Sequence, residues 1–188
     1  MRDGSKTRAK IVTEALRLFA QKGVAGTSIR DIAGAVGVAE AALYRHFPSK
    51  DALSRSLFLD GYARLAGDIL AADQAHDRFD TKITRIVEVF CDLFDEDRAL
   101  FTFLLLSQHA HLAEVPHEAG KNVVEAVHSI FAGAMQKREI REHDTDLLTA
   151  MALGIVAQPA IFTLYGRLQG PLRHRAPDMA KAILALVG

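Results

Sequence analysis

Apolar side chains recur three and four positions apart along almost the whole chain, which is the spacing of one face of an α-helix. In the N-terminal segment the apolar positions form a single stripe: Ile11, Val12, Ala15, Leu16, Leu18 and Phe19. This stripe predicts an amphipathic helix over residues 7–22. Gly23 follows directly and is a residue suited to ending a helix.

A shorter helical pattern comes next. Its apolar positions again form one stripe: Ile29, Ile32, Ala33 and Val36. Thr27 or Ser28 can cap its N-terminus, and Asp31 lies in the first turn, where a negative charge is favourable. Gly37 is expected to end this helix in a left-handed conformation.

A third pattern, residues 39–47, places Leu43 and Phe47 one helical turn apart on the buried side. The remaining side chains lie on other faces: Glu40, Ala41, Ala42, Tyr44, Arg45 and His46. A short helix held at a fixed angle by a tight turn can enter the major groove of DNA. The same spacing also occurs in an ordinary helical hairpin, so spacing alone leaves both interpretations open.

The rest of the chain is also helical in pattern, without a convincing alternating strand or an internal repeat. A polar break covers residues 73–80. Further helices are predicted over residues 49–72, 81–94, 98–109, 116–137, 144–167 and 177–187. Pro116 is expected to open one of these helices and Pro159 to kink another. The chain is therefore predicted to be all-α, with about nine helices and no sheet.

Four segments together carry a family resemblance: residues 27–33 (TSIRDIA), 37–38 (GV), 43–47 (LYRHF) and 49–53 (SKDAL). In this order they closely resemble the TetR family of bacterial transcriptional regulators, over residues 5–58. The resemblance implies a helix-turn-helix DNA-binding domain over residues 1–48, joined by a long helix to a ligand-binding and dimerisation domain over residues 49–188. It further implies a homodimeric repressor that a small, largely apolar effector releases from a palindromic DNA operator.

The resemblance also implies roles for individual side chains. Tyr44, His46 and Lys50 match family positions that bind the phosphate backbone. Thr27 and Ser28 are expected to add hydroxyl or amide contacts. Arg30 matches a position that sometimes reaches a base, and a guanidinium there can bind guanine in a bidentate manner.

The resemblance makes the third helix, residues 39–47, the DNA-recognition helix. Its opening turn departs from the family pattern. Ala39 offers no capping hydroxyl, and the next three residues offer no base-reading donor. Ala41 and Ala42 can meet thymine methyl groups, and Glu40 can accept a hydrogen bond from a cytosine amine. Specificity is therefore expected to depend on Arg30, Arg45 and DNA shape.

Charge is unevenly distributed, although the whole chain is formally neutral. Residues 1–55 hold ten Lys or Arg against five Asp or Glu, and residues 56–188 hold thirteen against eighteen. A basic N-terminal segment on an acidic body fits a protein that presents one end to DNA. The single Cys91 excludes an internal disulfide and, with no visible signal peptide, favours a cytoplasmic location.

The C-terminal region suggests self-association. No charged residue lies between Asp146 and Arg167, a span long enough to cross a bilayer, but its moderate apolarity favours a buried helix and no membrane partner. The resemblance implies that the last two helices of each subunit form a four-helix dimer interface. Burial within one subunit is the alternative.

The resemblance further implies an effector pocket in the ligand-binding domain. In the family, helices like those predicted here surround a cavity, and its candidate lining residues are Phe90, Phe94, Phe101, Leu105, His109, Phe131, Met135, Met151, Gln158, Phe162 and Tyr165. Each apolar member can equally be a core residue. His109 and His111 diverge on a helix, so neither a metal site nor a cofactor is expected. An enzyme is also not expected, because no nucleophile and base occur at a recognisable spacing. The alternatives are a DNA-binding architectural or regulatory protein without a small-molecule ligand and, less favoured by the residues, an enzyme that uses the helical C-terminal domain.

Overall fold

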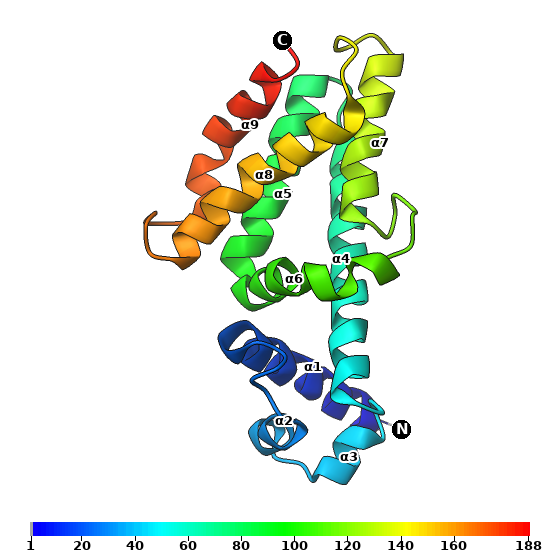
Figure 1. The fold of residues 1–188 in the computed structure, drawn as a ribbon, viewed down its shortest axis with the longest axis vertical. Helices are drawn as coiled ribbons and strands as arrows, with labels where there is room; N and C mark the ends of the chain where they lie inside the picture. Colours follow the sequence, from blue (N-terminus) through cyan, green and yellow to red (C-terminus); the bar gives the residue numbers. More distant parts are fainter. Residues whose placement is uncertain (1) are drawn as a thin grey trace. The chain divides into compact units, whose positions relative to one another are not determined.

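The computed structural model describes residues 2–188, which form nine α-helices and two short 3₁₀ helices and contain no strand (Figure 1). The helices are α1 (Arg2–Lys22), α2 (Ile29–Val36), α3 (Glu40–Tyr44), α4 (Lys50–Gln74), α5 (Phe79–Glu96), α6 (Arg98–His111), α7 (Val123–Gln136), α8 (Thr145–Leu164) and α9 (Ala176–Ala185). The 3₁₀ helices are η1 (Leu112–Glu114) and η2 (Leu172–Arg175). The all-α prediction is confirmed.

Several helix boundaries differ from the predictions, most of all those of α1, α3 and α7. Helix α1 begins at Arg2 rather than at residue 7, and α3 is shorter than the predicted 39–47. Helix α7 begins at Val123, so Pro116 does not open it. The cause is Asn122, whose side-chain oxygen accepts hydrogen bonds from the N–H groups of Val124 and Glu125 and caps the helix there.

The chain divides into two compact units. The N-terminal unit comprises the residues up to Gly61 together with residues 99–114, and the C-terminal unit comprises residues 62–98 and 115–188. The N-terminal unit thus contains α1, α2, α3, the first part of α4 and nearly all of α6. The domain boundary expected between residues 48 and 49 stays a prediction.

The N-terminal unit is built around side chains from each of its helices. Its fully buried members include Ile11, Phe19, Ile32, Leu43, Leu53, Phe58 and Phe103. The rings of Phe19 and Phe103 stack with their centroids 5.7 Å apart. Gly61 allows α4 to approach α6, because a Cβ atom there would lie 2.8 Å from a methyl group of Leu100.

In the C-terminal unit, α5 packs against α9 and α8, and α8 packs against α7 (Figure 1). The buried side of α5 includes Ile83, Val87, Phe90, Cys91 and Phe94. Burial, with the nearby carboxylates of Asp95 and Asp92, raises the pKa of the Cys91 thiol to about 12. The thiol is therefore protonated at neutral pH and serves as a small apolar side chain.

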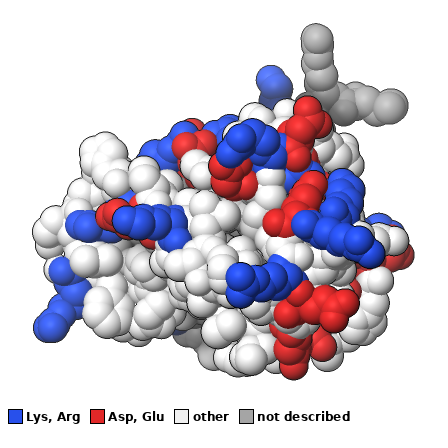
Figure 2. Space-filling view, turned by 90° about the horizontal axis from the view of Figure 1, so that it is seen from above, with Lys and Arg blue, Asp and Glu red and all other residues white. Residues whose placement is uncertain are grey.

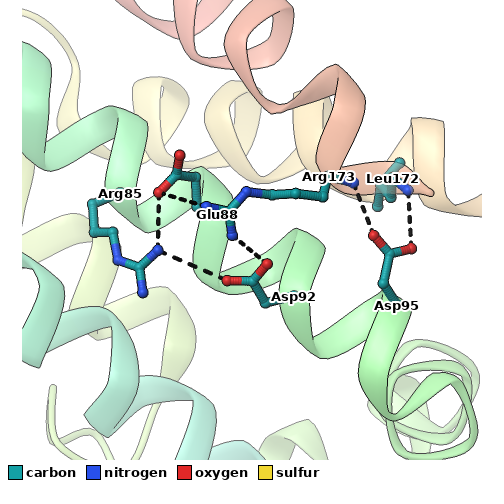
Figure 3. Close-up of polar contacts among 6 residues, drawn as sticks. All are labelled: Arg85, Glu88, Asp92, Asp95, Leu172 and Arg173. Carbon is teal, nitrogen blue, oxygen red and sulfur yellow. Dashed lines mark hydrogen bonds and ion pairs between the residues drawn. The ribbon is translucent and has the colours of Figure 1, made fainter.

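A polar network fixes the segment before α9 to α5 (Figure 3). The carboxylate of Asp95 accepts hydrogen bonds from the N–H groups of Leu172 and Arg173, both at 2.9 Å. The Arg173 guanidinium pairs with Asp92 and, at 3.1 Å, with Glu88. Leu172 is also fully buried. The polar network and the burial of Leu172 together hold the segment that leads into α9.

Candidate nucleic-acid interface

Helix α2 has the cap residues and bounds that the sequence predicts. The Ser28 hydroxyl accepts a hydrogen bond from the N–H of Asp31 at 3.1 Å, and the Asp31 carboxylate accepts one from the N–H of Ser28 at 2.9 Å. This reciprocal capping box satisfies two free donors at the start of the helix. At the other end Gly37 has φ of 78°, and its N–H donates to the carbonyl of Ala33.

Helix α3 presents one face that none of the described side chains of the N-terminal unit covers. Leu43 is fully buried and Phe47, just beyond the helix, is almost fully buried. The exposed residues are Glu40, Ala41, Tyr44 and Arg45, which lie on one side of a helix because they are spaced one, four and five apart. Ala42 and His46 are half-buried at its margin. As expected, Ala39 makes no capping hydrogen bond through its side chain.

Thr27 and Lys50, both expected at the DNA surface, make contacts inside the unit. Thr27 is 1% exposed, and its hydroxyl donates to the carbonyl oxygen of Gly23 at 2.8 Å. The half-buried Lys50 ammonium donates to the carbonyl oxygens of Val24 and Thr27, at 2.7 and 2.9 Å. Two of the three Lys50 donors are therefore used to join the start of α4 to the α1–α2 loop. Contact of either residue with DNA stays a prediction.

The remaining candidates on α2 are exposed. Ser28 and Arg30 both lie at the surface, and no carboxylate among the described side chains forms an ion pair with Arg30. α2 packs against α3, so Arg30 lies on the helix that adjoins α3, and Arg45 caps the end of α3. Elsewhere the surface is mixed: the face seen in Figure 2 carries Lys or Arg interspersed with Asp or Glu beside a broad uncharged area.

The candidate pocket residues are divided between the two compact units. Phe101, Leu105 and His109 belong to the N-terminal unit, and the other eight to the C-terminal unit. Of the eleven candidates, Phe90 and Phe131 are among the residues that line an apolar cavity between α5, α7, α8 and α9, which has a volume of about 20 Å³. That volume holds about one water molecule. The effector pocket therefore stays a prediction.

Several of the other pocket candidates are surface residues. Phe94 is fully buried in the core, but Met151 and Phe162 are each 40% exposed and Tyr165 is 75% exposed. Gln158 is exposed, and the half-buried Met135 accepts a hydrogen bond from the N–H of His143 at its sulfur. His109 is exposed, whereas the neighbouring His111 lies 3.0 Å from the Ser54 hydroxyl. Among the described residues, no three His, Cys, Asp or Glu side chains gather as metal ligands would.

Helix α8 is buried along one stripe only. Its buried apolar residues recur every four positions and face the rest of the C-terminal unit: Leu148, Ala152, Val156 and Ala160. The opposite side exposes Leu147, Met151 and Phe162, and a groove of about 410 Å³ runs between α8 and α9. α8 is long and apolar enough to cross a bilayer, and 28% of it is buried. The buried-helix interpretation therefore holds for one side of α8.

Replacing Ser28 by Ala should destabilise the N-terminal unit by about 1 kcal/mol, because the α2 N-cap loses its acceptor. The Ser28 hydroxyl, and then its N–H, hold the pKa of Asp31 below the usual value of 3.8. We expect this pKa to rise toward 3.8 in Ser28→Ala. Carboxyl-carbon NMR titration measures the pKa and urea unfolding measures the stability. An unchanged Asp31 pKa would contradict the capping-box account.

The same pKa shift predicts how stability depends on pH. Since the folded-state pKa of Asp31 lies below the unfolded value, its stabilising contribution is complete above about pH 4 and is lost as the pH falls through the folded pKa. Wild type should therefore be more stable than Asp31→Asn at neutral pH, and the difference should vanish in acid. A difference that persisted at the lowest pH would indicate another cause.

Comparison with known proteins adds independent findings. The sequence model described as "Bacterial regulatory proteins, tetR family" matches residues 11–57. The HTH-type transcriptional regulator AcrR of Shigella flexneri is 47% identical over 51 residues, which cover 27% of this chain and 24% of AcrR. The match thus spans about a quarter of that relative's length.

Two solved structures resemble nearly the whole chain. FadR from Bacillus subtilis in complex with stearoyl-CoA has a TM-score of 0.79 at 17% identity, covering 96% of this chain and 99% of FadR. AibR in complex with isovaleryl coenzyme A and operator DNA has a TM-score of 0.71 at 22% identity, covering 96% of this chain and 97% of AibR. At these identities the likeness shows the fold alone.

Proposed function

The chain belongs to the TetR family of bacterial regulatory proteins, and on that premise we propose that it is a ligand-responsive transcriptional repressor that binds a palindromic operator as a homodimer. The family consists of regulators rather than enzymes. The observation that carries the proposal is the uncovered face of α3, with Glu40, Ala41, Tyr44 and Arg45, on a capped helix-turn-helix. A short helix with one free face is what the major groove accepts.

Within this interface the cations have separate roles. Arg45, which directly follows α3, and Arg30 on α2 are exposed and can reach base edges or phosphates with five donors each. Lys50 has one donor left for a phosphate oxygen, so its main contribution is to hold the loop that precedes α2. Glu40 disfavours nearby phosphates and favours a base that presents an amine.

Binding to the DNA upstream of the chain's own coding sequence tests the proposal. The logarithm of the wild-type affinity should fall linearly with the logarithm of salt concentration, because phosphate contacts release counterions. Arg45→Ala should lose about 1–3 kcal/mol of affinity for this DNA. Arg141→Ala, which removes an exposed charge from the C-terminal unit, is the matched control. A salt-independent affinity, or equal losses in both variants, would count against the proposal.

Homodimerisation is proposed through α8 and α9. The exposed apolar side of α8 and the groove beside α9 form a surface larger than scattered single residues, and such surfaces favour association. A two-fold dimer would present two α3 helices to two operator half-sites.

Phe162→Glu should convert a dimer to a monomer, because it places a charge in the apolar interface. Leu106→Glu is the control, since Leu106 is 63% exposed on α6. Sedimentation velocity measures the mass, and circular dichroism checks that both variants stay helical. A Phe162→Glu protein that remained dimeric would place the interface elsewhere.

The proposed effector is a small, largely apolar molecule. FadR and AibR, which share the fold, are complexed with stearoyl-CoA and isovaleryl coenzyme A. The apolar cavity lined by Phe90 and Phe131 would have to widen to admit an acyl chain, since it now has about 20 Å³. Helix α4 runs from Lys50 to Gln74 through both units and is the element proposed to transmit the change to the DNA-binding end.

The small cavity also favours a second candidate, a DNA-binding regulator without a small-molecule ligand. A ligand that binds the folded protein raises its melting temperature. Stabilisation by an acyl-CoA that also releases DNA would support the repressor switch. No stabilisation across a series of acyl chain lengths would support the second candidate.

A further inference from the structure

Arg8 on α1 lies beside the residues that follow α3, the proposed recognition helix. Helix α1 starts at Arg2, so the chain is already helical where it passes α3 (Figure 1). The Arg8 guanidinium carbon is 5.1 Å from the centroid of the Phe47 ring. One turn earlier, a Cβ atom on Gly4 would lie 4.0 Å from the ring of His46. The N-terminal turns of α1 therefore lie beside His46 and Phe47, which directly follow α3 and its C-cap.

The Phe47 ring holds Arg8 in place without using its hydrogen-bond donors. A cation within about 6 Å of an aromatic centroid is attracted by the ring electrons. Arg8 is exposed, and among the described side chains no carboxylate pairs with it. Its N–H donors are thus available to a ligand. Lys50 differs, because two of its three donors bind carbonyl oxygens.

The length of α3 indicates what that ligand would be. Its five residues span only about 7.5 Å, so residues just beyond its ends also lie close to any DNA that α3 contacts. When such a helix lies in the groove, groups just beyond its ends approach the flanking phosphates. Arg8 is one of these groups, and a planar guanidinium matches a phosphate in a bidentate manner.

We propose that Arg8, positioned by the ring of Phe47, is a phosphate-binding residue of the DNA interface. This inference rests on the proposed DNA-binding function. It assigns the anchoring charge at the C-terminal end of α3 to α1, and it leaves Lys50 chiefly with the loop. Because a phosphate carries no sequence information, Arg8 contributes equally to every DNA sequence.

The test measures binding to a duplex of scrambled sequence over a series of salt concentrations. The proteins are wild type, Arg8→Ala, Arg8→Lys and Lys10→Ala. Lys10 is the matched control, because it is an exposed cation two residues along α1 and so about 200° around the helix from Arg8. The melting temperature of each protein is recorded in parallel.

Arg8→Ala should reduce the slope of log affinity against log salt by about 0.9 and weaken binding about tenfold near 0.1 M salt. Arg8→Lys should keep the wild-type slope, and so should Lys10→Ala. An Arg8→Ala protein with a lower melting temperature and the wild-type slope would overturn the inference, because Arg8 would then only cover Phe47. An equal loss of slope in Lys10→Ala would also overturn it. A wild type that binds no DNA at low salt would overturn the proposed function and this inference together.

Discussion

The recognition helix depends on the burial of Leu43 and Phe47. A helix of five residues without a side-chain N-cap is not stable in water by itself, because helix nucleation costs more than a few hydrogen bonds return. Burial of these two side chains is therefore what keeps α3 folded, in a unit whose core also contains buried residues of α1, α2 and the start of α4. Arg8 covers the outer side of Phe47, and Lys50 holds the loop before α2. The exposed face of α3 is available to DNA because the opposite face is fixed.

Local sequence chemistry allowed some elements to be predicted. Helix α2 was predictable at both ends, because Ser28, Asp31 and Gly37 are cap residues whose action needs no distant partner. The start of α7 was not, because both Pro116 and Asn122 can open a helix, and the cap that forms is the one made by Asn122. The first turns of α1 were missed for a related reason, since residues 2–6 carry no apolar stripe.

The candidate site divides in the same way. The exposure of Glu40, Ala41, Tyr44 and Arg45 follows from helical spacing once Leu43 is buried. The partners of Lys50 are carbonyl oxygens, whose direction the sequence does not encode. Met151, Phe162 and Tyr165 were expected to line a pocket and are exposed in the structure. The sequence could not indicate this, because an apolar residue can serve a pocket, a core or a subunit interface with the same chemistry. Apolar pattern therefore located α8 but did not say what would cover it.

We propose that α3 is presented to the major groove, once in each half of a two-fold dimer. Selection of bound duplexes from a random DNA library by the purified wild-type protein tests this most directly. An inverted repeat should be enriched, with half-site centres one helical turn or a multiple of it apart. A pool that shows no enrichment over the starting library would contradict the proposal.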